Sequence, residues 1–311
     1  MTSIVNEHGS GVRPPIRQGR LGGPSRRFDR RITAFRDDLA AVDLAGTIIA
    51  ARYAEGVALQ STSPVTMLHR HPDSAAVAVS AVLFGEEFVI YDVIDGWAWG
   101  KCSHDGYVGW IRSAALAAKG LVAVTHVIGA PAAPVFAAPD IKSSVVSILP
   151  LNARIAATGT IGAFATIADG FVHNRHLCSI GDAANDPVAM ALNFIGTPYV
   201  WGGRTRDGID CSGLTQAVLH ACGLPCPRDS DQQAEAFVAI DDEERRRGDL
   251  VIFPGHVGIL ADAKTLIHAT AHWMMTVVEP LAAATERLSA TGFCRPPLDA
   301  GRPLVRPNEP R

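Results

Sequence analysis

A β-rich segment recurs in the middle of the chain, and this repeat restricts the possible folds more than any other feature. The segment PDSAAVAVSAVLFG at 72–85 is followed 67 positions later by PDIKSSVVSILPLN at 139–152. A DGYV turn at 105–108 corresponds in the same way to DGFV at 169–172, 64 positions later. Short strands separated by Gly or Asp-Gly turns favour small β-barrels. We therefore expect two small β-barrel units, at residues 60–119 and 120–181, the second of them divergent.

The composition indicates a folded protein and excludes several classes of partner. Hydrophobic residues make up 48% of the chain and charged residues 19%, with a formal net charge of −3. This balance gives no reason to expect a nucleic-acid partner. No stretch approaches the ~20 consecutive apolar residues of a membrane span, so no membrane partner is expected. The six cysteines are dispersed, and the C-x3-C pair at 222 and 226 has no second pair, so we expect free thiols, no metal site and no cofactor.

Residues 1–59 form a basic N-terminal arm and a lead-in to the repeat. Residues 1–37 contain eight Arg and three acidic residues, with Gly and Pro scattered between them. They contain no apolar core of the kind that a secretion signal needs. We therefore expect a loose basic arm and a cytoplasmic location.

The pattern changes after about residue 182, where helical spacing replaces short strands. Three helix starts are predicted, at the Asp186-Pro187 pair, at Asp210 as N-cap, and at Ser230 with Gln233 as a capping box. The first helix is expected to end at Gly196. Strands then follow at 250–253, 257–261, 265–269 and 275–278. Helices before a sheet in one domain, residues 182–311, predict the α+β class.

Three residues of this domain suggest nucleophilic catalysis. Cys211 lies in the first turn of its predicted helix, where the helix dipole favours a thiolate and lowers the thiol pKa. A turn near 262–264 places residue 270 opposite His256, so His268 is one diagonal away on the same face of the sheet. A thiolate nucleophile needs such an imidazole partner. From position alone, however, a buried structural cysteine and a core pair of histidines remain open interpretations.

The combined motifs resemble those of a known family. The blocks TPYVWGG, DCSGL, PRDS, GHVGI and LIHAT, in this order from about 186 to 296, resemble the NlpC family of papain-like bacterial cell-wall peptidases. The pattern DGWxxG…DGYxGWI resembles bacterial SH3-like domains, well over 60–118 and weakly over 121–181. The resemblance implies a papain-like catalytic domain preceded by two SH3-like barrels. It also implies Cys211 as nucleophile, His256 as base, His268 as orienting residue and Tyr199 as an aid to the oxyanion or the substrate.

NlpC-type enzymes with N-terminal SH3-like domains often cleave the γ-D-glutamyl–diamino acid bond of peptidoglycan peptides. The resemblance therefore implies a murein tripeptide or tetrapeptide substrate with a free N-terminal L-Ala. A cationic amine needs a carboxylate beside it, and Asp210 is one candidate, although it also suits the N-cap. Glu86 and Tyr107 are candidates because the second unit has Ala153 and Phe171 in their places. The full set of expected substrate-binding residues is Asp210, Ser212, Ser230, Trp201, Glu86 and Tyr107.

The leading hypothesis is a cytoplasmic cysteine endopeptidase that recycles murein peptides. One alternative is an exported hydrolase that acts on the intact wall. A second is a non-catalytic wall-binding protein in which the SH3-like units supply the function. A third is thiol-dependent acyl transfer to or from lipid, which uses the same Cys–His chemistry. The oligomeric state stays open.

Overall fold

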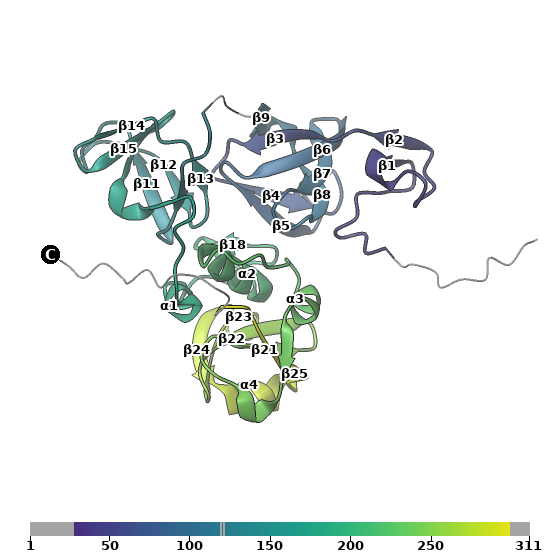
Figure 1. The fold of residues 1–311 in the computed structure, drawn as a ribbon, viewed down its shortest axis with the longest axis vertical. Helices are drawn as coiled ribbons and strands as arrows, with labels where there is room; N and C mark the ends of the chain where they lie inside the picture. Colours follow the sequence, from purple (N-terminus) through teal and green to yellow (C-terminus); the bar gives the residue numbers. More distant parts are fainter. Residues whose placement is uncertain (1–27, 119, 121, 299–311) are drawn as a thin grey trace, which may run out of the picture.

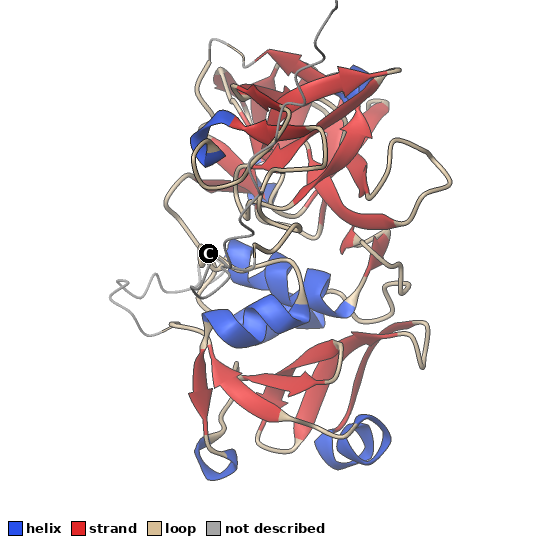
Figure 2. Cartoon of the chain, turned by 90° about the vertical axis from the view of Figure 1, so that its right-hand side faces the viewer, coloured by secondary structure: helices blue, strands red, loops and turns tan. Residues whose placement is uncertain are grey.

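The computed structural model describes residues 28–118, 120 and 122–298. Two β units lie side by side above a C-terminal domain of helices and a sheet (Figure 1). In the perpendicular view some helices of that domain lie between the β units and its own sheet, and others lie at the far end of the sheet (Figure 2). Within the described residues, no helix has the length and apolar character needed to cross a membrane.

The lead-in segment packs onto the first β unit instead of forming a loose arm. Strand β1 (Leu39–Ala41) pairs in parallel with β2 (Arg52–Ala54). Ala34 and Leu39 are buried in one cluster with the tryptophans Trp97, Trp99 and Trp110. The expectation of a loose arm over residues 1–37 is therefore wrong for residues 28–37, because Ala34 and Arg36 pack against tryptophans of the first unit. Residues 1–27 lie outside the described part of the chain.

The first β unit is one antiparallel sheet with a buried core. Its strands are β3 (Val57–Ser61), β4 (Val65–His69), β5 (Ala78–Leu83), β6 (Glu87–Ile94), β7 (Trp97–Cys102), β8 (Val108–Arg112) and β9 (Leu116–Ala118). Their order in the sheet is β5-β4-β8-β7-β6-β3-β9. Leu68, Phe88 and Ile111 are fully buried in its centre. The Asp-Gly turn at 95–96 has positive φ at both residues, which allows the tight connection from β6 to β7.

The second unit repeats the order of elements seen in the first. Its strands are β10 (His126–Ile128), β11 (Ala132–Phe136), β12 (Val145–Pro150), β13 (Arg154–Ile155), β14 (Gly159–Ile161), β15 (Phe164–Ile167), β16 (Gly170–His173) and β17 (Leu177–Ser179). They form one sheet of three strands and one of five. Strands β11 and β12 begin 67 residues after β4 and β5, as the sequence repeat predicts. That this unit is an SH3-like barrel stays a prediction.

The C-terminal domain has the predicted order of helices followed by a sheet. Its helices are α1 (Pro187–Leu192), α2 (Cys211–Ala221), α3 (Ser230–Ala236) and α4 (Leu281–Leu288). Its strands are the short pair β18 (Arg204–Thr205) and β19 (Gly208–Ile209), then β20 (Val238–Ile240), β21 (Leu250–Phe253), β22 (His256–Asp262), β23 (Thr265–Thr270), β24 (Met275–Pro280) and β25 (Gly292–Arg295). The last six form a sheet in the order β20-β25-β21-β22-β23-β24. The α+β class is confirmed in this mixed domain.

The helix starts agree with the sequence except at α3. Asp186 and Asp210 are N-caps, and their carboxylates accept hydrogen bonds from the first turns of α1 and α2. At α3 the N-cap is Asp229, with Gln232 completing the capping box, so the capping role expected for Ser230 is wrong. Both residue types suit an N-cap, and the local pattern does not separate them. Helix α1 also ends at Leu192, before the expected Gly196.

Candidate active site

The Cys211 thiol lies at the start of α2, where the helix packs on the C-terminal sheet. Cys211 shares one buried core cluster with Val257 of β22. Its sulfur accepts hydrogen bonds from the backbone N–H groups of Val257 and Ser212. Gly213 is needed because a Cβ there would lie 2.2 Å from the carbonyl oxygen of Gly203. The fold therefore fixes the thiol beside the first residues of β22.

Burial has a larger effect on this thiol than the helix dipole. Burial and the neighbouring Asp210 charge together raise the pKa of Cys211 to about 11. The expectation of a lowered thiol pKa is therefore wrong for this structure. The residue rests as a neutral thiol, so attack on a carbonyl requires a base to remove its proton.

The imidazole pair is placed as the sequence register predicts. Pairing of Ile259 with Ile267 between β22 and β23 brings His256 Nε2 within 2.8 Å of His268 Nδ1. Burial lowers the pKa of His256 to about 3, with further lowering by His268. His256 is therefore a neutral imidazole near neutral pH and is able to accept a proton.

Glu279 of β24 extends this pair into a chain, and sequence reasoning missed it. Its Oε1 lies 2.6 Å from His268 Nε2, and its carboxylate also pairs with Arg287 of α4. The carboxylate can only accept, so His268 Nε2 carries the proton and His268 Nδ1 accepts from His256 Nε2. The Nδ1 atom of His256 is then left with a free lone pair. The chain of bonds thus fixes the tautomer that a general base needs.

Tyr199 and Trp201 lie in the loop that precedes β18. The N–H of Tyr199 donates to the carbonyl oxygen of Met274 at 2.9 Å, which holds the loop on the sheet. Burial and the neighbouring Asp210 charge raise the pKa of Tyr199, so its hydroxyl stays protonated near the thiol. Trp201 is 62% exposed at the rim of the site.

One cavity of about 220 Å³ joins the thiol to the first β unit and to the lead-in segment. Five of the six expected substrate-binding residues line it. The lining consists of Arg31, Val79, Tyr107, Trp201, Asp210, Cys211, Ser212, Asp229, Ser230, Asp231 and Gly255. Ser230, although not the N-cap, therefore reaches the cavity from the first turn of α3.

Asp210 lines the cavity, but its carboxylate is already paired with an arginine. Its two oxygens accept from Arg228 at 2.9 and 2.6 Å, and also from the N–H groups of Gly202 and Gly213. Arg228 is fully buried and also donates to the hydroxyl of Ser212 at 2.9 Å. The buried ion pair and the two backbone N–H groups therefore use the accepting positions of Asp210, and its binding of a substrate ammonium stays a prediction.

Asp229 is a second carboxylate in the lining of this cavity. Its Oδ2 accepts from the Tyr107 hydroxyl at 2.9 Å and from Arg31 Nη1 at 2.8 Å. Asp229 stands in the PRDS block, so the motif that indicated Ser230 as a binding residue also contained Asp229. Tyr107 belongs to the first β unit, which confirms that this unit reaches the cavity of the thiol.

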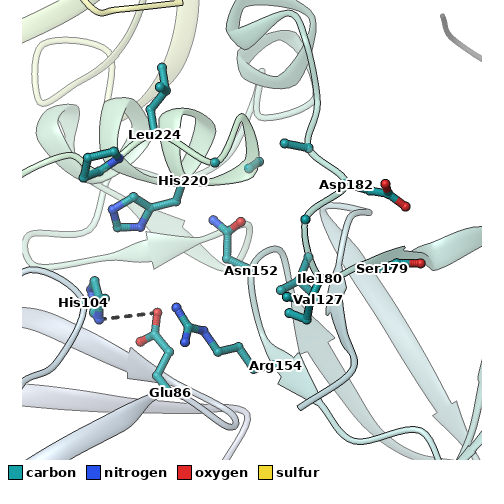
Figure 3. A pocket seen from close by; sticks show the side chains of 15 residues that line it. Glu86, His104, Val127, Asn152, Arg154, Ser179, Ile180, Asp182, His220 and Leu224 are labelled. Carbon is teal, nitrogen blue, oxygen red and sulfur yellow. Dashed lines mark ion pairs between the residues drawn. The ribbon is translucent and has the colours of Figure 1, made fainter. Parts of the chain in front are cut away.

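Glu86 does not line that cavity, which corrects a second expectation. Its carboxylate pairs with Arg204 of β18 at 3.0 and 3.1 Å and accepts from the N–H of Leu83. It lines a different cavity, of about 480 Å³, where the two β units meet α2 (Figure 3). His104 lies beside Glu86 there, and His220 of α2 lies opposite (Figure 3). Glu86 thus holds the first unit on the C-terminal domain and does not face substrate.

The same interface contains potential metal ligands. Within the described residues, Cys102, His104 and Asp105 place one ligand atom each within 4.8 Å of one another. The Asp105 carboxylate, however, already accepts from Gln216 Nε2 at 2.9 Å and from the N–H of Tyr107. None of these three residues lines the cavity that contains the Cys211 thiol.

A cysteine at the start of a helix, packed on a sheet that carries an imidazole pair, is the arrangement of papain-like cysteine peptidases. Comparison with known proteins agrees. Residues 196–285 match the NlpC/P60 family, and residues 68–116 match the bacterial dipeptidyl-peptidase SH3 domain. The chain therefore carries an NlpC/P60 domain preceded by a bacterial dipeptidyl-peptidase SH3 domain. NlpC/P60 peptidases are cysteine peptidases.

Individual relatives cover most of the described chain. The chain is 26% identical to gamma-D-glutamyl-L-lysine dipeptidyl-peptidase of Bacillus subtilis, over 62% of this chain and 72% of the relative. It is 29% identical to dipeptidyl-peptidase 6 of Lysinibacillus sphaericus, over 65% of this chain and 84% of the relative. The crystal structure of an NlpC/P60 family protein from Bacillus cereus superposes with a TM-score of 0.68 at 19% identity, covering 77% of this chain and 99% of that one. The last comparison shows a shared fold.

Proposed function

We propose that this chain is a cysteine endopeptidase that cleaves the γ-D-glutamyl–diamino acid bond of murein tripeptides or tetrapeptides with a free N-terminal L-Ala. The observation that carries the proposal is the position of the Asp229 carboxylate. It lines the same cavity as the Cys211 thiol and is held by the Tyr107 hydroxyl at 2.9 Å. The names of the two relatives described above support a hydrolase of peptidoglycan peptides.

The cavity suits a short, positively charged end of a peptide. A free α-amine is cationic near neutral pH, and a carboxylate is its natural partner. The cavity is small, about 220 Å³, and Val79 and Tyr107 of the first β unit form part of its wall. A short L-Ala-γ-D-Glu group fits such a space, whereas a long chain on the amine does not. The same reasoning favours released peptides over peptides attached to glycan.

The proposed reaction begins with proton transfer from the Cys211 thiol to His256. The sulfur attacks the γ-carbonyl carbon of D-Glu, a C–S bond forms, and the carbonyl electrons move to oxygen. His256 then gives its proton to the leaving amine as the C–N bond breaks, which releases the diamino acid and leaves a thioester. A water molecule, deprotonated by His256, attacks the thioester and returns the thiol and a free carboxylate.

The other residues of the site would support these steps. His268 and Glu279 hold His256 in the tautomer whose Nδ1 accepts the thiol proton. We propose that the Tyr199 hydroxyl, which stays protonated, donates to the carbonyl oxygen as it gains negative charge. Ser212, Ser230 and Trp201 line the same cavity, and we propose that they contact the bound peptide.

Mass spectrometry of digests tests the proposal directly. The purified chain is incubated with L-Ala-γ-D-Glu-diaminopimelate and with the same peptide N-acetylated on the alanine. We expect release of diaminopimelate from the free peptide and at least tenfold slower release from the acetylated one. Acetylation removes the charge that Asp229 would bind. Equal rates on both peptides, or full activity of Cys211→Ala, would refute the proposal.

A further inference from the structure

Arg31 of the lead-in segment lines the same cavity as Cys211, although no motif marks it. Its guanidinium joins three carboxylates. Nη1 donates to Asp229 at 2.8 Å and to Asp231 at 2.9 Å. Nη2 donates to Asp231 at 2.7 Å and to Asp29 at 2.8 Å, and Nε donates to Asp29 at 3.1 Å. Asp229 and Asp231 belong to the start of α3, so Arg31 ties the lead-in segment to the edge of the site.

The segment around Arg31 is fixed on both sides. The carbonyl oxygen of Arg31 accepts from the N–H of Val108 in the first β unit at 2.7 Å. Gln232 of α3 donates to Asp29 at 3.1 Å. The backbone N–H of Thr33 donates to the carbonyl oxygen of Asp29 at 2.9 Å, which closes a local turn. Residues 29–33 therefore bridge the first unit and the C-terminal domain beside the cavity, and Arg31 belongs to the cavity lining.

The hydrogen-bond inventory shows what Arg31 is able to do. A guanidinium has five N–H donors, and all five of Arg31 point at carboxylate oxygens. No donor is left for a carboxylate of the substrate, so Arg31 is not a ligand for D-Glu. Three carboxylates also surround one guanidinium, so the cluster keeps a net negative charge. Asp229 therefore remains attractive to an ammonium group while Arg31 closes the space beyond it.

We propose that Arg31 is a positioning residue that clamps residues 29–33 over the end of the cavity and thereby restricts the enzyme to peptides with a short, free N-terminal group. The proposal rests on the proposed function and adds to it a specific cause of the restriction. Tyr107 and Val79 supply one wall, and the Arg31 clamp supplies the end wall. The carboxylate that binds the ammonium is held by the same clamp, so loss of Arg31 both frees Asp229 and opens the end.

The test is the ratio of kcat/KM on free L-Ala-γ-D-Glu-diaminopimelate to kcat/KM on the same peptide extended by N-acetylation or by one N-terminal Gly. We expect this ratio to fall at least tenfold in Arg31→Ala, through a higher KM for the free peptide and faster cleavage of the extended ones. Arg31→Lys keeps the positive charge but loses the forked donors of the guanidinium, and we expect its kcat/KM ratio to lie between those of the wild-type chain and Arg31→Ala. Arg30→Ala is the matched control, because Arg30 is the neighbouring residue and pairs with exposed Asp37 at the surface. Its ratio should be unchanged.

The outcomes separate this inference from the proposed function. If the wild-type chain prefers the free peptide and Arg31→Ala keeps that preference while remaining folded by thermal denaturation, the clamp is wrong and the proposed function stands. If Arg31→Ala lowers KM for the free peptide, Arg31 competes with the ammonium and the clamp is again wrong. If the wild-type chain shows no preference, both proposals fall. If Arg31→Ala shows both a lower kcat/KM ratio and a lower thermal stability, Arg31→Lys decides. An intermediate kcat/KM ratio in Arg31→Lys at wild-type thermal stability would support the clamp.

Discussion

Replacing Glu279 by Gln tests whether the fixed tautomer of His256 controls the chemistry. The substitution keeps the size of the side chain and removes its charge. The amide of Gln is able to donate as well as accept, so His268 Nε2 no longer has to carry the proton. If the amide donates, the order of hydrogen bonds reverses, and the proton moves to His256 Nδ1. That atom is then unable to accept the proton of the Cys211 thiol.

The size of the effect follows from the hydrogen bond that is lost. A hydrogen bond to a charged group contributes about 1.5–3 kcal/mol, against about 0.5–1.5 kcal/mol for a neutral one. The difference of about 1–1.5 kcal/mol corresponds to roughly tenfold in rate. Arg287, which pairs with Glu279, also becomes a free positive charge beside His268. That charge opposes protonation of the imidazole pair, so tenfold is a lower bound on the loss of kcat.

The assay is kcat and its pH profile on L-Ala-γ-D-Glu-diaminopimelate. Glu279 raises the pKa of His268, so its loss should move the acid limb of the profile to lower pH, together with the fall in kcat. KM should change little, because Glu279 does not line the cavity. Glu286→Gln is the matched control on the exposed face of α4. A Glu279→Gln variant within twofold of wild type in kcat, with an unshifted acid limb, would contradict the tautomer argument.

Three further predictions concern the nucleophile, the amine site and the interface. Cys211→Ala should abolish peptide cleavage, whereas Cys222→Ala and Cys226→Ala should keep it; activity in Cys211→Ala, measured by mass spectrometry, would defeat the mechanism. Tyr107→Phe removes a hydrogen bond to the charged Asp229 and should raise KM for the free peptide by roughly tenfold at unchanged kcat. An unchanged KM would show that the hydroxyl does not position Asp229. Burial opposes the charge of Glu86, but Arg204 and His104 lower its pKa overall to about 2. The charged form therefore stabilises the fold above about pH 4.5, and this stability is lost as the pH falls toward 2. Urea unfolding between pH 6 and 3 should therefore show a smaller loss in Glu86→Gln than in wild type, and parallel curves would argue against this linkage.

Local patterns in the sequence predicted the parts of the site that depend on neighbouring residues. The cap at Asp210 places Cys211 in the first turn of a helix, and the 262–264 turn fixes the register of His256 and His268. Both features arise within a few residues of the chain. Short-range geometry is enough to derive them.

The roles of the carboxylates were harder to predict from the sequence, because their partners are far away along the chain. Glu86 pairs with Arg204 across 118 residues, and Arg31 pairs with Asp229 across 198. Nothing in the local pattern distinguishes a charge that is paired at such a distance from one that is free to bind substrate. The sequence therefore named Asp210 and Glu86 as free carboxylates, when each was already paired with a buried arginine.

The two buried arginines indicate why the first β unit is part of the site. Arg204 and Arg228 are each 1% exposed. Arg204 donates to the Glu86 carboxylate and the Ala81 carbonyl oxygen of the first unit, and Arg228 donates to the Ser80 hydroxyl of the same unit. Buried ion pairs add little net stability, but breaking one is costly because the remaining charge has no partner. The first unit is therefore held in one orientation on the C-terminal domain. That orientation places Tyr107 against Asp229, so the proposed recognition of a peptide end depends on buried ion pairs that lie outside the cavity lining.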